Sequence, residues 1–85
     1  MQITKKVGNE MQITYCGVWN YKPRAVSLAA ELKESLGLDA ELIQSSGGVF
    51  EIEYKGKLIF SKKMLGRFPE DGEILSLIDK ANKNC

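Results

Sequence analysis

Apolar and polar side chains first alternate at residues 11–15, which read MQITY. A period of two is typical of a β-strand with one buried face, so this segment is predicted to be the first strand. The same four letters, MQIT, also open the chain, but a four-residue echo is too short for a structural repeat. We therefore place the start of the domain at residue 9 and take residues 1–8 as an extension or a lead-in to the strand.

The next stretch changes to the helical period of three and four, with apolar positions at Ala25, Leu28, Ala29, Leu32 and Leu36. Pro23 suits the first turn of such a helix, where its missing N–H would have no partner. Gly37 suits the end, where a left-handed cap is common. The alternative is a helix that begins near Gly17 and bends at Pro23.

A second strand is predicted at residues 39–45, followed by a turn at residues 45–48. The segments VFEIEY and KLIFSK then flank Lys55-Gly56 and form a hairpin signal. A two-residue loop there predicts pairing of Tyr54 with Lys57 and of Ile52 with Ile59. In that register one face carries Phe50, Ile52 and Ile59, and the other carries Val49, Leu58 and Phe60 beside Glu51 and Glu53.

The C-terminal part contains a predicted loop at residues 64–69 (MLGRFP) and a last helix at residues 71–82 with Asp71 as its N-cap. Residues 83–85 are taken as a tail. The order strand, helix, strand, strand, strand, helix predicts an α/β (α+β) domain over residues 9–82. The strands joined by the first helix should be parallel, which gives a four-stranded mixed sheet with two helices on one face. This β-α-β-β-β-α order is a minimal thioredoxin-like fold.

Composition narrows the functional classes. A chain of 85 residues forms one domain, and its 44% hydrophobic and 27% charged residues are ordinary for a soluble protein. The net charge of +1 carries no basic stripe, so nucleic acid is not an expected partner. No apolar run reaches membrane-spanning length and the N-terminus lacks a signal-peptide core, so we expect no membrane partner and a cytoplasmic location.

The chemistry available is further restricted because the chain contains no histidine. The usual general base and histidine-containing metal sites are therefore absent. Two cysteines, Cys16 and Cys85, are too few for a disulfide scaffold or a tetrahedral zinc site, so no metal and no bound cofactor are expected. Thiol chemistry is the best remaining candidate.

Cys16 leaves the first predicted strand just before a glycine and a helix. Amides and the dipole at a helix N-terminus stabilise a thiolate, which makes this a favourable place for a nucleophilic sulfur. The alternative is that Cys16 is a small buried hydrophobic residue at a strand end. Cys85 is a poor resolving partner, because it ends a polar tail far along the chain.

Three segments in order, YCGVWNYKPRA, SSGGVFEIEYKGKLIFSKK and GRFP, resemble the selenoprotein W branch of the Rdx family over residues 10–80. The resemblance implies a thioredoxin-like fold and a redox-active Cys-x-x-selenocysteine or Cys-x-x-Cys motif after the first strand. It also implies thiol or selenol oxidoreduction of peroxides or disulfides in the cytosol, with glutathione as the reductant or adduct and a protein thiol or disulfide as a possible substrate. We expect a monomer or a weak dimer.

On this resemblance the first motif cysteine is Cys16, the loop is Gly17-Val18, and the second redox position holds Trp19. Indole has no redox sulfur, so this chain cannot close the usual ring and its activity should be reduced. One hypothesis is that the native protein carries selenocysteine at residue 19, because the tryptophan codon UGG differs by one base from UGA. The alternative is a natural homologue in which Trp19 packs against the helix or covers Cys16.

Thioredoxin-like proteins usually place a cis-proline opposite the motif, whereas this chain has Ser46-Gly47-Gly48-Val49 there. This segment is either a substrate ledge of bare backbone or an ordinary turn. Trp19, Tyr21 and Phe68 are predicted to form an apolar rim around Cys16. The rival to an enzyme is a redox-fold module that binds a partner protein without turnover.

Overall fold

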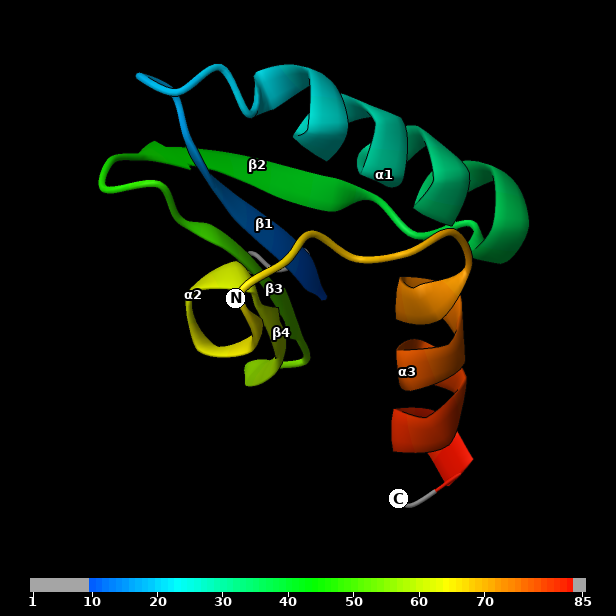
Figure 1. Ribbon diagram of the computed structural model, residues 1–85. Helices are drawn as coiled ribbons and strands as arrows, with labels where there is room; N and C mark the ends of the chain where they lie inside the picture. Colours follow the sequence, from blue (N-terminus) through cyan, green and yellow to red (C-terminus); the bar gives the residue numbers. More distant parts are fainter. Residues whose placement is uncertain (1–9, 84–85) are drawn as a thin grey trace, which may run out of the picture.

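The computed structural model describes residues 10–83. The elements, in chain order, are β1 (Met11–Cys16), α1 (Lys22–Leu36), β2 (Ala40–Ser45), β3 (Phe50–Tyr54), β4 (Lys57–Ser61), α2 (Lys62–Leu65) and α3 (Glu73–Lys83). The predicted fold class is confirmed, with one short helix added (Figure 1). The predicted extension 1–8 and Cys85 lie outside the described residues.

The four strands form one mixed sheet in the order β2-β1-β3-β4. Strand β1 pairs parallel with β2 and antiparallel with β3, so the motif strand is central. The register places Cys16 opposite Ser45 on one side and Tyr15 opposite Phe50 on the other. The carboxyl end of β1 therefore lies beside the end of β2 and the start of β3.

Helix α1 follows the predicted pattern at both ends. Pro23 stands in its first turn, and Gly37 ends it in the left-handed region at φ 69°. The Gly37 N–H donates to the Lys33 carbonyl (3.0 Å) and the Leu38 N–H to the Leu32 carbonyl (3.3 Å). These bonds satisfy carbonyls that the helix itself leaves unpaired. Of the two predicted starting points, the one at Pro23 is confirmed, since the helix begins at Lys22.

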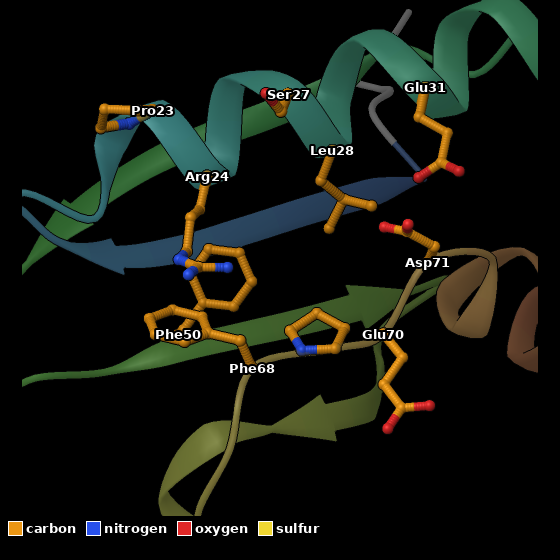
Figure 2. Close-up of a pocket in the computed structure, with 10 residues that line it drawn as sticks. Pro23, Arg24, Ser27, Leu28, Glu31, Phe50, Phe68, Glu70 and Asp71 are labelled. Atoms are coloured by element: carbon orange, nitrogen blue, oxygen red, sulfur yellow. The ribbon is translucent and has the colours of Figure 1, made fainter.

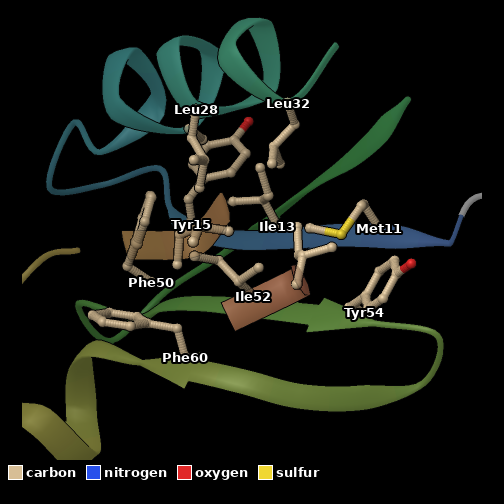
Figure 3. Packing of buried hydrophobic residues seen from close by; sticks show 12 residues of the cluster. Met11, Ile13, Tyr15, Leu28, Leu32, Phe50, Ile52, Tyr54 and Phe60 are labelled. Atoms are coloured by element: carbon tan, nitrogen blue, oxygen red, sulfur yellow. The ribbon is translucent and has the colours of Figure 1, made fainter. Parts of the chain in front are cut away.

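The hydrophobic core lies between α1, α3 and one face of the sheet (Figure 3). Its strand residues occupy alternate positions, and its helix residues recur at spacings of three and four, as the pattern predicts. Fully burying one large aliphatic or aromatic side chain stabilises a domain by about 1.5–3 kcal/mol. The cluster contains Met11, Ile13, Tyr15, Ala25, Leu28, Leu32, Phe50, Ile52, Tyr54, Phe60, Ile74 and Ile78.

The predicted hairpin register holds next to the turn, where Tyr54 pairs with Lys57 and Glu53 with Leu58, and is wrong from Ile52 onward. Tyr54 pairs with Lys57 as expected, but Ile52 pairs with Phe60 because the ladder shifts between Ile52 and Glu53. One extra residue in β4 reverses which side chains face the core. Phe60 is consequently buried, while Leu58 is 47% exposed. The prediction that Ile59 shares the Phe50 face and Phe60 the opposite one is thereby corrected.

The predicted loop at residues 64–69 is partly helical. Ser61 ends β4 and caps α2, its hydroxyl accepting the Met64 N–H at 3.4 Å. Helix α3 begins at Glu73, two residues after the predicted N-cap Asp71. At this end the Glu73 carboxylate accepts the Glu70 N–H at 2.9 Å. The Glu73 side chain thus reaches back to an amide that precedes the helix, as the glutamate of a capping box does, whereas an Asp71 cap would have accepted an amide of the first turn.

Candidate functional site

Cys16 is the last residue of β1 and is fully buried. Its N–H donates to the Val49 carbonyl (2.9 Å) and its carbonyl accepts the Tyr21 N–H (3.1 Å). Its Sγ accepts the N–H of Trp19 at 3.3 Å. Cys16 does not belong to the main hydrophobic cluster. The sulfur therefore lies outside that cluster at the strand end, with the Trp19 amide as its hydrogen-bond donor.

Residues 17–20 form a turn, and this corrects the prediction of a helix N-terminus at the sulfur. The Gly17 carbonyl accepts the Asn20 N–H at 3.2 Å, and Asn20 takes the left-handed conformation at φ 61°. Helix α1 begins only at Lys22. The amide that reaches Cys16 Sγ belongs to this turn. The polar contact expected from a helix N-terminus is therefore made by an amide of the turn.

Trp19 lies against the Gly47-Gly48 turn that follows β2. A Cβ on Gly48 would stand 2.6 Å from Cζ3 of the indole, so the ring rests directly on the glycine backbone. Gly48 has φ 73° and is buried, whereas Gly47 has φ 79° and open space around it. The predicted ledge is therefore not bare, because the indole covers Gly48.

The predicted site residues come together at one end of the sheet. The Cys16 N–H donates to the Val49 carbonyl, and the Gly17 N–H donates to the Ser45 carbonyl at 3.1 Å. The indole of Trp19 contacts Gly48. Ser46 is exposed on the same turn, and Val18 is 79% exposed at the tip of the motif. Their proximity agrees with the predicted arrangement, while their roles stay predictions.

The aromatic rim forms a continuous row. Trp19 and Tyr21 meet edge to face at 6.1 Å between ring centroids, and Tyr21 meets Phe68 at 4.8 Å. Phe68 in turn meets Phe50 of the core at 5.3 Å. Trp19, at the outer end, is 60% exposed. The rim thus leads from the motif toward α3 and does not enclose Cys16 as a ring.

Two cations cover this rim, and sequence reasoning missed both. The Arg24 guanidinium lies 4.1 Å from the Phe68 centroid, and the Lys62 ammonium lies 5.3 Å from the same centroid. Lys62 is also 5.6 Å from the Tyr21 centroid. Residue 24 is far in sequence from residues 62 and 68, so no local pattern indicates that it meets them.

An ion pair holds the segment that carries Phe68. The Arg67 guanidinium donates to both Glu73 oxygens at 2.7 and 2.9 Å, and also to the Phe68 carbonyl at 3.1 Å. The hydrogen bond from Arg67, and then the one from the Glu70 amide, lowers the pKa of Glu73 to about 2. The same hydrogen bond raises the pKa of Arg67. This pair connects the end of α2 to the start of α3.

Within residues 10–83, no group of three or more acidic, cysteine or histidine side chains is arranged to hold a metal ion. None of the helices in that part of the chain is long and apolar enough to cross a membrane.

Two solved structures have the same fold. A protein from Bordetella parapertussis superimposes with a TM-score of 0.80 at 30% sequence identity, covering 84% of this chain and 94% of that one. A selenoprotein W-related protein from Vibrio cholerae gives a TM-score of 0.78 at 29% identity, covering 84% and 92%.

Sequence comparison also identifies related proteins. Migration and invasion enhancer 1 from Bos taurus and from Mus musculus are each 32% identical over 76 residues, which is 88% of this chain. The aligned region spans 66% of the length of these relatives. The family model named Rdx family matches residues 10–80, a stretch that holds the Cys16 motif, the whole sheet and most of α3. The chain belongs to the Rdx family.

Proposed function

We propose that this protein is a thiol oxidoreductase in which Cys16 is the reactive residue. One observation carries the proposal: Cys16 Sγ ends the central strand and accepts the Trp19 N–H at 3.3 Å, inside the motif turn of an Rdx domain. An amide N–H at this place can donate to the negative charge that the sulfur carries when it attacks or leaves as a thiolate. We place the reaction in the cytosol, where glutathione keeps thiols reduced.

A one-thiol route needs no second sulfur in the chain. The Cys16 thiolate attacks one sulfur of a disulfide, forms a mixed disulfide and releases the other sulfur as a thiolate. Glutathione thiolate then attacks the substrate sulfur of that mixed disulfide, which frees Cys16 and leaves a glutathione–substrate disulfide. With a peroxide, the Cys16 thiolate attacks one oxygen, the O–O bond breaks, and the other oxygen leaves as an alcohol or water, which gives a sulfenic acid. Glutathione condenses with the sulfenic acid to release water, and a second glutathione reduces the resulting mixed disulfide and frees Cys16.

Trp19 stands where a second redox residue would resolve the mixed disulfide. We propose that the native form carries selenocysteine at residue 19, in which case the selenolate attacks the oxidant or substrate and Cys16 resolves the intermediate. The native codon at this position tests that hypothesis directly. UGA there supports it, whereas UGG in a host without selenocysteine machinery refutes it.

The redox site is tested by Trp19→Cys in a Cys85→Ser background. If residues 16 and 19 form a redox motif, mild oxidant should close an intramolecular disulfide, seen as a mass loss of two hydrogens and reversed by dithiothreitol. Adding Cys16→Ser should abolish both the mass change and any gain in glutathione-coupled turnover. A Trp19→Cys protein that keeps both thiols reduced under mild oxidant would contradict the proposal.

A second function, binding of a partner protein without turnover, is favoured by the exposure pattern. Cys16 is fully buried, while Val18 and Trp19 are 79% and 60% exposed, so the motif presents apolar side chains and hides its sulfur. Turnover by the Trp19→Cys protein that is lost with Cys16→Ser identifies an oxidoreductase. No turnover in either protein, together with no disulfide, identifies the binding module.

A further inference from the structure

We propose that the groove between α1 and residues 68–71 binds an extended peptide segment of a partner protein that carries an acidic and a basic side chain about three residues apart. The inference rests on the proposed function only in taking this partner to be the redox substrate. Figure 2 shows the groove, with α1 on one side and the segment leading to α3 on the other.

The groove is a cavity of about 400 Å³ with an apolar floor and charged ends. Leu28 and Phe50 are core residues that reach its floor, and Phe68 and Pro69 form the wall opposite α1. This volume is at the low end of the range for ligand sites. An apolar floor of this kind accepts an aliphatic or aromatic side chain from a peptide.

Arg24 supplies a positive charge at one end. Its guanidinium stacks on Phe68 at 4.1 Å, which leaves the N–H groups at its edge pointing away from the ring. Among residues 10–83, the ion pairs involve Lys33, Arg67 and Lys83, and none involves Arg24. A guanidinium placed over an aromatic ring, with no ion-pair partner within residues 10–83, is suited to a carboxylate, which it can bind through two parallel hydrogen bonds.

Three carboxylates line the groove. Glu70 points away from α1, whereas Glu31 on α1 and Asp71 on the segment before α3 stand at the other end. In Figure 2 both side chains extend toward the space between these elements. Neither is a member of an ion pair in the described part of the chain. Like charges that face one space repel each other, and a bound ammonium or guanidinium would relieve that repulsion.

The separation of the two ends sets the length of the ligand. Arg24 and Glu31 are seven residues apart on one helix, which is two turns and about 10 Å of rise. Three residues of peptide in the polyproline II conformation span about 9 Å and complete one turn, so the side chains of residues i and i+3 lie on the same face. A segment with an acidic residue, two intervening residues and a basic residue therefore matches both charged ends at once, and its intervening residues pass over the apolar floor.

The position of the groove indicates which end of such a segment lies near the redox motif. Phe68 lines the groove and contacts Tyr21, which contacts Trp19. Arg24 is stacked on this same Phe68. The acidic residue of the partner is thus the one closer to the motif, and the disulfide to be attacked should lie beyond it.

The test is an NMR titration of the full-length ¹⁵N-labelled protein with two short peptides, acetyl-Asp-Leu-Ala-Lys-amide and its reverse, acetyl-Lys-Leu-Ala-Asp-amide. At millimolar concentration at least one should shift the amide signals of Ser27, Leu28 and Phe68 in a saturable way. Peptides with Asn for Asp, or with Gln for Lys, should bind more weakly. Arg24→Gln and Glu31→Gln should each weaken binding about threefold to tenfold.

Glu34→Gln is the matched control, because Glu34 is an exposed glutamate on α1 that does not line the groove, and it should leave binding unchanged. The proposal is overturned if shifts map elsewhere, if the neutral peptides bind equally well, or if Arg24→Gln and Glu31→Gln have no effect. Concentration-dependent shifts of the same amides without peptide would assign the groove to a second copy of the chain instead. Disulfide closure in the Trp19→Cys protein does not use the groove, so its outcome separates failure here from failure of the proposed function.

Discussion

The core beneath the two long helices and the turn after β1 bury opposite kinds of side chain. In the core, large apolar residues such as Leu32 and Phe50 are buried at the positions that the sequence period predicts. In the turn, the small sulfur of Cys16 is fully buried, while the largest side chain in the protein, Trp19, is 60% exposed. Hydrophobic burial explains the first region and does not explain the second.

The turn is held by polar contacts and close backbone packing. Hydrogen bonds join Cys16 to Val49 and to Tyr21, and the indole of Trp19 rests on Gly48. Because an exposed indole gives up much of the free energy that its burial would supply, the arrangement is better suited to a site than to a core. This contrast leads to predictions that differ between the two regions.

The largest expected effect is loss of stability from the core. Phe60→Ala should lower the free energy of unfolding by about 3–5 kcal/mol, because the ring is buried and leaves a cavity. Trp19→Ala should cost only about 1 kcal/mol despite its larger side chain. Urea unfolding measures both, with the exposed Leu58→Ala as control. Equal losses for Phe60→Ala and Trp19→Ala would remove the contrast between the two regions.

A smaller effect is expected at Gly47 and Gly48, the two glycines of the turn beside Trp19. Gly47→Ala and Gly48→Ala both place a Cβ at positive φ, which costs about 1–2 kcal/mol each. Only Gly48→Ala also meets the indole, so it should be the more destabilising of the two.

Trp19→Ala supplies the control for that comparison. Because the nearest atoms to a Cβ on Gly48 all belong to the indole, the difference in unfolding free energy between Gly47→Ala and Gly48→Ala should shrink in the Trp19→Ala background. A difference that persists undiminished there would mean that the indole does not rest on Gly48 in solution.

The smallest effect concerns the ion pair behind the rim. The folded-state pKa of Glu73, about 2, lies below its ordinary value. Its contribution to stability is therefore present above about pH 4.3 and is lost as the pH falls toward 2. Glu73→Gln should flatten the pH dependence of urea unfolding in this window, and Glu34→Gln should not. An unchanged acid dependence in Glu73→Gln would contradict the role given to Arg67.

Local patterns were sufficient for most of the fold. Pro23 and Gly37 mark the ends of α1, and Lys55-Gly56 marks the hairpin turn. These residues are readable from the sequence because each one directly sets the local backbone conformation. The bulge in β4 was not predictable, since the run LIF at residues 58–60 has no polar residue to fix the register. An apolar run fits either face equally well.

The candidate site was predictable in part. The position of Cys16 at a strand end follows from the alternation in residues 11–15 and from Gly17. The contact of Trp19 with Gly48 and the stacking of Arg24 on Phe68 join residues more than 25 positions apart, so neither has a local signal. The Ser61 cap of α2 was missed for a different reason, because its segment also reads as the end of a strand.

The central claim is that Cys16 is a reactive thiol closed off by the motif turn, whose Trp19 rests on Gly48, and the rate of its alkylation by iodoacetamide tests this most directly. In the Cys85→Ser protein at neutral pH, alkylation of Cys16 should be limited by local opening of the motif turn. Removing the indole with Trp19→Ala should raise that rate about tenfold, because opening no longer requires the ring to leave Gly48. Equal rates with and without the indole, both far below that of free glutathione, would contradict the account and leave Cys16 as a structural residue.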